Sequence, residues 1–450
     1  MSTTNDPGNK LPTPGQRVSR RDALKIGAGL GTAAISIPAF LSACGGTNSL
    51  VSSSTPAAAS GDKTLRVYWN PGHNYTTYQN VIAQFKKDTG WDVKLEQYQW
   101  PDLRTKLLAN FAANDVPDLV EQPGAWVQEF ALGGKLLSLQ KYVDKDKQST
   151  GFPDDWQGYT VDGSTANGEI YGVPLHLTCN LPFYNKDLFA KAGINSFPTT
   201  WDDFLSAAKE LTGGNVYGFA MNQDSGYSWP WYLQNKVHLY DAQKNVLTLD
   251  NDSAYEALQF QYDLIYKHKV APVPLNTGSY DGPQKLFSAG RAAIILTGPW
   301  DIKPILTGSP NLHWDVAQAL THQTQSTYTA GSGLFIPKAA KNPDQAWELI
   351  KRLTTLNTEL TATKEARMTM PRKSWGSNAD VKQTPIISAF GQGLTYAEYD
   401  DALVKNVATT KVSAINSLFD KAFQDVIYKQ APVAQTLKDF VAAGNKILGS

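Results

Sequence analysis

The order of secondary structure between residues 65 and 122 constrains the fold more than any other feature of the chain. Apolar periodicity predicts strands at 65–69, 91–98 and 117–122, and helices at 75–89 and from Pro101. Strands that alternate with helices in this order predict an α/β fold, with a parallel sheet and helices on both of its faces. In such sheets ligands bind beyond the carboxyl ends of the strands.

Several residues follow these strand ends and are therefore candidates for a binding site. Trp69 and Asn70 follow the first strand, and Glu121 and Gln122 follow the third. Trp126 comes about one turn later, where packing against a neighbouring aromatic residue is an equally good interpretation. Glu121 also fits the interpretation of a solvated loop carboxylate.

The same types of element recur in the rest of the chain. Further strands and helices are predicted at 169–174, 177–184, 200–211, 292–296, 334–337 and 345–353. Thr200 is a plausible N-cap for the helix at 200–211, because acidic residues follow it in the first turn. Trp300 and Asp301 follow the strand at 292–296 and join the candidates. No short-period repeat is visible, which excludes a solenoid or a propeller.

The first 43 residues have the pattern of an export signal. Arg20 and Arg21 precede an apolar run at 26–43 that is rich in Gly and Ala, which is typical of a signal peptide and not of a membrane-spanning helix. The sequence Leu-Ser-Ala-Cys that ends at Cys44 resembles a bacterial lipobox. That resemblance implies that Cys44 becomes the lipidated first residue of the mature protein. Both the twin-arginine route and the general export route remain open.

Residues 45–61 are mostly Gly, Ser, Thr, Ala and Pro, which predicts a flexible tether after Cys44. The only other cysteine is Cys179, so a lipidated Cys44 leaves no partner for an internal disulfide. A domain of this length does not need one, because its core is large. Cys179 lies in an apolar stretch and is interpreted as a small buried residue.

Charge and motifs exclude several classes of function. The chain has 41 basic and 41 acidic residues, which gives no electrostatic footprint for nucleic acid. His73, His176 and His238 are scattered along the sequence, and no set of His, Cys, Asp and Glu has the spacing of a metal site. Phosphate-binding, dinucleotide-binding and nucleophile-elbow motifs are absent from the sequence. We therefore expect no metal, no cofactor and no catalytic residue.

Four stretches of the sequence together resemble one family. They are 184–204 with Tyr-Asn-Lys and Pro-Thr-Thr-Trp-Asp-Asp-Phe, 287–300 with Gly-Arg-Ala-Ala-Ile and Gly-Pro-Trp, 331–348, and the lipoprotein start. The chain resembles the extracellular solute-binding proteins of carbohydrate ABC importers, of the maltodextrin-binding type. The resemblance extends from about residue 62 to the end.

The resemblance implies a two-lobed, periplasmic-binding-protein-like fold of type II, with the ligand in the cleft between two α/β lobes. Crossings between the lobes are expected near 177–180, 280–286 and 337–341. Lobe one is then 62–177 plus 287–337, and lobe two is 178–286 plus 338–450. The implied protein is not an enzyme. It is a monomer that is exported, is anchored by Cys44 to the outer face of the cytoplasmic membrane, and delivers a sugar to the permease subunits of an ABC importer.

A sugar presents apolar C–H faces to aromatic rings and hydroxyl groups to polar side chains. Under the resemblance, Tyr184 lies just past the first crossing, and Trp229 and Trp231 lie in a loop of lobe two. Core packing is an even alternative for both tryptophans. Gly331 and Gly333 allow close backbone approach. Arg372 lies in a Met-Pro-Arg stretch that resembles the family's Pro-x-Arg, with a surface role as the alternative. The ligand-binding candidates are therefore Trp69, Asn70, Glu121, Gln122, Trp126, Tyr184, Trp229, Trp231, Trp300, Asp301, Gly331, Gly333 and Arg372.

Two other functions compete with sugar capture. A secreted glycoside-active enzyme needs two carboxylates that face a scissile bond, for which Glu121 and Asp301 are the available pair. A binding protein for a polyamine or a peptide is the other alternative, and a polyamine site requires clustered acids. The mixed aromatic and amide candidates favour a neutral polyol.

Overall fold

The computed structural model describes residues 63–124, 126–275, 281–398 and 402–449. The described residues belong to one compact unit within residues 60–450. The predicted signal peptide, Cys44 and the tether lie outside the described residues. Within the described part, no helix has the length and apolar character that a membrane crossing requires.

The first of two large sheets contains the predicted β-α-β-α-β order. Its path is β14-β13-β3-β1-β2, with β6 also paired to β13. The strands are β1 (Thr64–Trp69), β2 (Asp92–Gln97), β3 (Leu119–Pro123), β6 (Gly172–Cys179), β13 (Thr327–Phe335) and β14 (Ala397–Glu398). β1 pairs in parallel with β2 and β3, as predicted, whereas β13 is antiparallel to both β3 and β6. The sheet is therefore mixed and not purely parallel.

The helices α1 (Thr76–Thr89) and α2 (Trp100–Ala113) connect the first three strands. Tyr78 and Phe85 of α1 are buried in one core with Leu65 and Val67 of β1. The helix ends at Gly90, whose left-handed φ of 71° is accessible to glycine without a steric cost. Both α12 (Pro343–Leu353) and α13 (Leu356–Ala366) pack into this same core. We call this part lobe one.

The second large sheet forms the centre of lobe two and has the order β12-β7-β11-β8. Its strands are β7 (Leu181–Asn185), β8 (Tyr217–Ala220), β11 (Ala292–Thr297) and β12 (Trp314–Val316). It is covered by helices that include α7 (Trp201–Leu211), α9 (Asp252–Tyr266), α18 (Thr409–Lys429) and α19 (Val433–Gly449). Thr200 caps α7 as predicted, since its hydroxyl oxygen accepts a hydrogen bond from the backbone N–H of Asp203.

The other elements are short. The remaining helices are η1 (Pro71–His73), α3 (Trp126–Leu132), α4 (Gln140–Thr150), α5 (Gly158–Asp162), α6 (Lys186–Lys191), η2 (Ser225–Ser228), α8 (Trp229–Gln234), α10 (Gly282–Ser288), η3 (Pro299–Asp301), α11 (Ile302–Gly308), α14 (Lys373–Ser377), α15 (Ala379–Lys382), α16 (Pro385–Gly393) and α17 (Ala402–Asn406). The remaining strands are β4 (Thr165–Ala166), β5 (Glu169–Ile170), β9 (Tyr240–Asp241) and β10 (Val246–Leu247).

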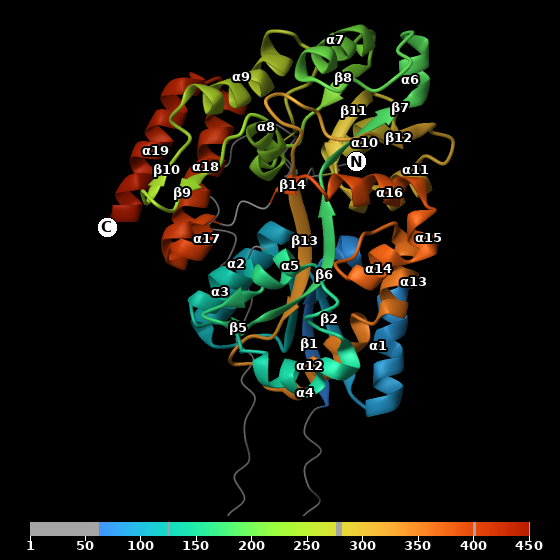
Figure 1. Cartoon of the computed structure of the whole chain (residues 1–450), viewed down its shortest axis with the longest axis vertical. Helices are drawn as coiled ribbons and strands as arrows, with labels where there is room; N and C mark the ends of the chain where they lie inside the picture. Colours follow the sequence, from blue (N-terminus) through green and yellow to red (C-terminus); the bar gives the residue numbers. More distant parts are fainter. Residues whose placement is uncertain (1–62, 125, 276–280, 399–401, 450) are drawn as a thin grey trace, which may run out of the picture. The chain divides into compact units, whose positions relative to one another are not determined.

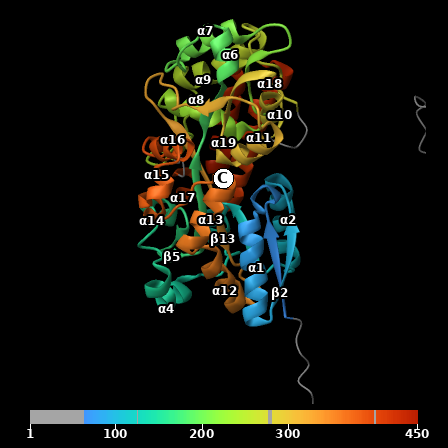
Figure 2. The ribbon, with the colours of Figure 1, turned by 90° about the vertical axis from the view of Figure 1, so that its right-hand side faces the viewer.

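Three segments of chain cross between the lobes. β6 of the first sheet passes into β7 of the second at Asn180, within the range 177–180 where a crossing is predicted. β13 brings the chain back to lobe one, and α16 returns it to lobe two, with Ile387 in the core of lobe one and Phe390 in that of lobe two. Figure 1 shows β6 and β13 running between the lower and the upper half of the picture, and Figure 2 shows the two halves from the side.

The other predicted boundaries between the lobes are wrong. β11 was expected in lobe one with 287–337, but it pairs with β7 and β8 and buries Ile294 in the core of lobe two. The chain at 280–286 therefore stays in lobe two and does not cross. The crossing expected at 337–341 is also absent, because the N–H of Lys338 donates to the carbonyl of Lys135 in lobe one. Contacts between segments that are distant in the sequence therefore decide to which lobe each part of the chain belongs.

Candidate functional site

A cavity of about 180 Å³ lies between the two lobes, and we call it the central cavity. Its walls come from the crossing strands β6 and β13, from lobe one, and from the loops of lobe two that hold η2 and η3. The lining residues are His73, Trp100, Pro123, His176, Thr178, Asn180, Asp224, Gly226, Tyr227, Trp300, Tyr328, Gly331, Ser332 and Met368.

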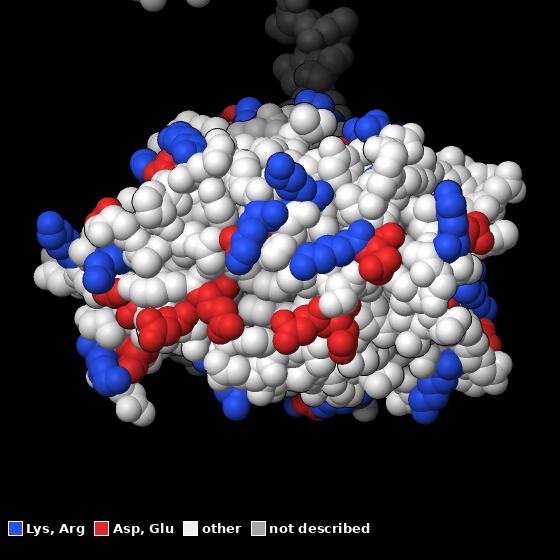
Figure 3. Space-filling view, turned by 90° about the horizontal axis from the view of Figure 1, so that it is seen from above, with Lys and Arg blue, Asp and Glu red and all other residues white. Residues whose placement is uncertain are grey.

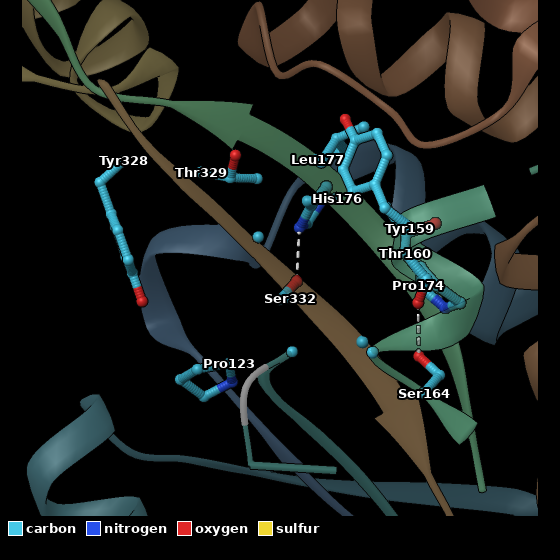
Figure 4. A pocket seen from close by; sticks show the side chains of 14 residues that line it. Pro123, Tyr159, Thr160, Ser164, Pro174, His176, Leu177, Tyr328, Thr329 and Ser332 are labelled. Atoms are coloured by element: carbon cyan, nitrogen blue, oxygen red, sulfur yellow. Dashed lines mark hydrogen bonds between the residues drawn. The ribbon is translucent and has the colours of Figure 1, made fainter. Parts of the chain in front are cut away.

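A second cavity, the side cavity, is lined in part by the same two strands (Figure 4). It shares Pro123, His176, Tyr328, Gly331 and Ser332 with the central cavity. Its other lining residues include Tyr159 and Ser164 from α5 and the loop after it. The wall common to both cavities is therefore formed by β13, the neighbouring part of β6 and the end of β3.

Four aromatic side chains line the central cavity: Trp100, Tyr227, Trp300 and Tyr328. Trp300 belongs to η3, directly after β11, and is the predicted strand-end tryptophan that does reach the cavity. Its ring meets Tyr227 edge to face, with the centroids 6.3 Å apart, and it also packs against the core of lobe one. Its indole Nε1 is buried and has no hydrogen-bond partner among the described residues. Trp300 thus offers both a ring and an unused donor.

Beside the cavity, Glu121 lies at the centre of a buried polar network. Its Oε1 lies 2.6 Å from His73 Nδ1 and 3.8 Å from His176 Nδ1, and its Oε2 accepts from the N–H of Asn70 at 3.0 Å. Burial, together with the nearby His73, lowers the pKa of His176 well below its ordinary value. Glu121 is fully buried and does not line either cavity, so it holds His73 and the chain at Asn70 in place.

His176 is held on both of its ring nitrogens. Nδ1 lies 2.8 Å from Ser332 Oγ on β13 (Figure 4), and Nε2 lies 2.9 Å from the hydroxyl of Tyr78 on α1. The strands β6 and β13 approach closely here, since a Cβ placed on Gly331 would lie only 2.4 Å from the carbonyl oxygen of His176. Gly331 therefore permits the close contact of the two strands beside the cavity. At Gly333 the contact is less close, since an added Cβ would lie 3.2 Å from the carbonyl oxygen of Val173.

Most of the other residues predicted from strand ends are packing residues in the structure. Trp69 is buried, and its Nε1 donates to the carbonyl of His73, so it supports the loop beside the cavity. Asn70 caps η1 through Gly72, and its Nδ2 is buried without a partner in the described part. Both amide atoms of Gln122 are likewise buried and unpartnered among the described residues. Trp126 lies against Arg104, whose guanidinium carbon is 5.2 Å from the ring centroid.

The candidates Tyr184, Trp229 and Trp231 of lobe two are packing residues as well. Tyr184 packs against Phe189 and Phe197 away from both cavities. Trp229 stacks on a phenylalanine of α18, and Trp231 packs against Trp201, so the core interpretation is correct for both. Each is buried because α8 turns its aromatic side chains toward the core of lobe two.

Asp301 follows Trp300 in the sequence, and its Oδ2 accepts from the hydroxyl of Thr297 at 2.6 Å. Burial raises the pKa of Asp301 to about 7, against the opposing hydrogen bond from Thr297. Arg372 is buried in lobe one, with its guanidinium 3.9 Å from the centroid of Trp156 and hydrogen-bonded to Asp155 and to the carbonyl of Thr354. Neither Asp301 nor Arg372 lines the central or the side cavity.

The cavity also contains residues that the sequence reasoning missed. Thr178 and Asn180 lie at the crossing predicted near 177–180, and this position could have identified them. Tyr227 is close in sequence to the predicted loop tryptophans. For the others no signal in the sequence was available, because distant segments meet there: His73, Trp100, His176, Asp224, Tyr328 and Ser332.

The structure also shows where Cys179 and the charged side chains of one face lie. Cys179 is fully buried, as predicted, and burial raises the pKa of its thiol. Acidic and basic side chains are interspersed over the face of the molecule shown in Figure 3.

Comparisons with known proteins agree with this architecture. The model of a family described as bacterial extracellular solute-binding protein matches residues 69–356. A protein of Brucella abortus (strain 2308) is 25% identical over 292 residues, 61% of this chain and 67% of that protein. The galactooligosaccharide-binding protein of Bacillus subtilis (strain 168) is 22% identical over 409 residues, 88% of this chain and 91% of that protein.

Among solved structures, an ABC transporter solute-binding protein from Thermotoga lettingae TMO, bound with alpha-D-tagatose, has a similar fold. The TM-score is 0.78 at 22% sequence identity, and the match covers 86% of this chain and 100% of that one. This likeness confirms the two-lobed α/β fold.

Proposed function

Because the chain belongs to the bacterial extracellular solute-binding protein family, we propose that it captures a sugar or an oligosaccharide and presents it to an ABC importer. The observation that carries the proposal is the central cavity, in which aromatic rings of both lobes stand beside polar groups. Trp100 and Tyr328 come from lobe one and its crossing strand, and Tyr227 and Trp300 come from lobe two. Each ring offers a face or an edge to the C–H groups of a sugar.

The polar groups of the cavity suit a neutral ligand. Thr178, Asn180 and Ser332 offer hydroxyl and amide groups for sugar hydroxyls, and the buried Nε1 of Trp300 is an unused donor. Asp224 is the only carboxylate among the described residues that line the cavity. A polyamine would require several acids, so this composition favours a polyol. The galactooligosaccharide-binding relative and the tagatose-bound structural neighbour support the same class of ligand.

Closure of the lobes would bury the ligand, as in hinge-type binding proteins. Three crossing segments serve as the hinge, and contacts on two sides already join the lobes. Lys303 of lobe two donates to Glu365 of lobe one at 2.8 Å. On another side Arg104 donates to Ser413 of α18 at 2.5 Å.

We also propose that the protein binds its ligand without catalysing a reaction. The two carboxylates that a glycosidase would need are engaged elsewhere, since Glu121 is bound to His73 and Asn70, and Asp301 accepts from Thr297. Neither lines the central cavity. We further propose export, lipidation of Cys44, a tether at 45–61, and action as a monomer outside the cytoplasmic membrane. The lipobox-like sequence before Cys44 supports the anchor.

The test is a thermal-shift screen of the full chain against mono- and oligosaccharides, polyamines and short peptides. A ligand that binds only the native state, at a hundredfold excess over its Kd, stabilises by about 2.7 kcal/mol, which is a measurable shift of the melting temperature. A shift with one sugar class, confirmed by calorimetry, is the expected result. A shift with an amine or a peptide and with no sugar would refute the sugar proposal.

A further inference from the structure

Three buried side chains beside the central cavity direct ligand atoms toward one another. They are His73, Glu121 and His176, and one ligand atom of each lies within 4.8 Å of the others. The closest pair is His73 Nδ1 and Glu121 Oε1 at 2.6 Å, and His176 Nδ1 lies 3.8 Å from the same oxygen. Around tetrahedral zinc, with bonds of roughly 2.0–2.2 Å, neighbouring ligand atoms are about 3.3–3.5 Å apart. The observed separations bracket that value.

We propose that His73, Glu121 and His176 bind a divalent transition-metal ion, and that zinc is the ion that this set of ligands fits best. Two imidazoles and one carboxylate form a known zinc ligand set with an open fourth position. Imidazole nitrogen excludes magnesium and calcium as preferred ions, because these prefer oxygen ligands. The proposal does not depend on which solute the cavity takes.

The surroundings of the three residues support this assignment, because ligands of a metal are usually oriented by further hydrogen bonds. The second nitrogen of His176, Nε2, lies 2.9 Å from the hydroxyl of Tyr78, and Nδ1 would bind the ion in place of its present contact with Ser332 Oγ at 2.8 Å. The second oxygen of Glu121, Oε2, accepts from the N–H of Asn70 at 3.0 Å. In both side chains one atom is held by a neighbouring residue, and the other takes part in a hydrogen bond that the ion would replace.

Burial gives the site a physical reason to hold a cation. Glu121 is 0% exposed, and His176 and His73 are 2% and 8% exposed. An ionised carboxylate at this depth is costly unless a positive charge lies beside it. A divalent ion between the carboxylate and two neutral imidazoles supplies that charge. Because His73, His176 and Ser332 line the central cavity, water or an oxygen of a bound solute can complete the coordination.

The test measures zinc binding to the full chain without a histidine tag. The protein is treated with EDTA, the chelator is removed, and Zn²⁺ is titrated by calorimetry. We expect one equivalent of Zn²⁺ to bind the wild type and to raise its melting temperature. Glu121→Gln keeps the shape of the side chain but removes the charged ligand. Loss of a residue that only supports a metal ligand typically weakens metal binding by about 10–100-fold, so we expect Glu121→Gln to weaken the binding of Zn²⁺ at least as much. Equal affinity in the wild type and in Glu121→Gln would overturn the proposal.

Two further variants separate a built site from adventitious binding. Tyr78→Phe keeps all three ligands and removes only the support of His176, so a loss of about 10–100-fold is expected. His238→Gln removes an exposed histidine, with 52% of its side chain accessible, and should leave zinc binding unchanged. A loss of binding with His238→Gln would show adventitious surface binding and contradict the proposal.

If Glu121→Gln fails to fold, the binding of Co²⁺ to the wild type tests the proposal instead. Visible d–d absorption that appears with one equivalent of Co²⁺ and disappears on addition of Zn²⁺ supports the site, and its absence refutes it. The sugar screen repeated in EDTA tests the proposed function separately, so that either proposal can fail alone.

Discussion

The carboxylate of Glu365 on α13 accepts hydrogen bonds from Lys303 of the opposite lobe at 2.8 Å and from the N–H groups of Thr76 and Thr77 at 2.9 Å. One side chain thus connects the N-terminus of α1 with lobe two. Burial opposes ionisation of Glu365, but the hydrogen bonds from Lys303, Thr77 and Thr76 outweigh it and lower its pKa to about 2.

This contact predicts a pH dependence that Glu365→Gln removes. A carboxyl whose pKa is depressed in the folded state contributes stability above its unfolded pKa, here 4.5, and loses it as the pH falls toward about 2. We expect the wild type to melt at a higher temperature than Glu365→Gln at pH 7, and the difference to shrink as the pH falls below about 4.5. Thermal melts of both proteins from pH 7 to pH 3 measure it, and a constant difference would contradict the prediction.

Asp301 predicts the opposite pH dependence, because burial raises its pKa to about 7. Between the ordinary value of 3.8 and about 7 the unfolded chain releases a proton that the folded protein keeps, so rising pH destabilises the fold. Asp301→Asn removes the titrating group and still accepts from Thr297. The wild type should therefore lose stability relative to Asp301→Asn between pH 4 and pH 7, as measured by urea unfolding. Parallel curves over this range would show that Asp301 does not titrate there.

Trp300→Ala tests the aromatic wall of the central cavity. Loss of the ring should weaken the binding of the sugar found in the screen by about tenfold or more, which is about 1.4 kcal/mol. The melting temperature should change little, because Trp300 is only partly buried. Trp314→Ala is a matched control, since that ring stacks on Phe183 and lines neither cavity. Calorimetry that gives equal affinities for Trp300→Ala and the wild type would remove Trp300 from the site.

Gly331→Ala tests the close approach of β6 and β13. The new methyl group would lie 2.4 Å from the backbone carbonyl of His176, and the strands must separate to admit it. We expect a loss of roughly 1–3 kcal/mol in the free energy of unfolding. Gly376→Ala is the control, because no heavy atom lies within 4 Å of its added Cβ. Denaturant unfolding compares the two, and equal stabilities would show that the strands adjust without strain.

Cys44→Ser tests the lipid anchor. Without a thiol to receive the lipid, the exported protein should move from the membrane fraction to the soluble fraction. Fractionation of cells that produce each form, followed by immunoblotting, measures this shift. Tight membrane association of the variant would refute lipidation at Cys44.

The sequence predicted local structure well because local structure depends on local patterns. The helix at 75–89 and its flanking strands follow from apolar spacing and from Gly90, and Thr200 caps α7 by its own hydroxyl. Trp300 was identified because it follows a predicted strand, and ligands bind beyond the strand ends in α/β sheets. The same rule selected Trp69, whose side chain turns into the core. A strand end does not determine which of two adjacent side chains faces the ligand.

Assignments that depend on distant segments failed for a physical reason. β11 is apolar enough to fit either sheet, and its pairing with β7 and β8 decides its lobe. His73, Glu121 and His176 lie far apart in the sequence and meet only because β13 pairs with both β3 and β6, while η1 follows the end of β1 beside β3. No spacing rule for metal ligands applies to residues on three separate elements.

The position of β13 has a consequence for how the chain folds during synthesis. In the sheet of lobe one, this strand lies between β3 and β14 and also pairs with β6, although residues 327–335 leave the ribosome long after β3 and β6. Until then β3 and β6 present unpaired strand edges, which favour aggregation. Lobe two needs α19, at the end of the described chain, for its own core. The core of lobe one therefore cannot form before residues 327–387 have been synthesised, and that of lobe two forms only after α19 has followed.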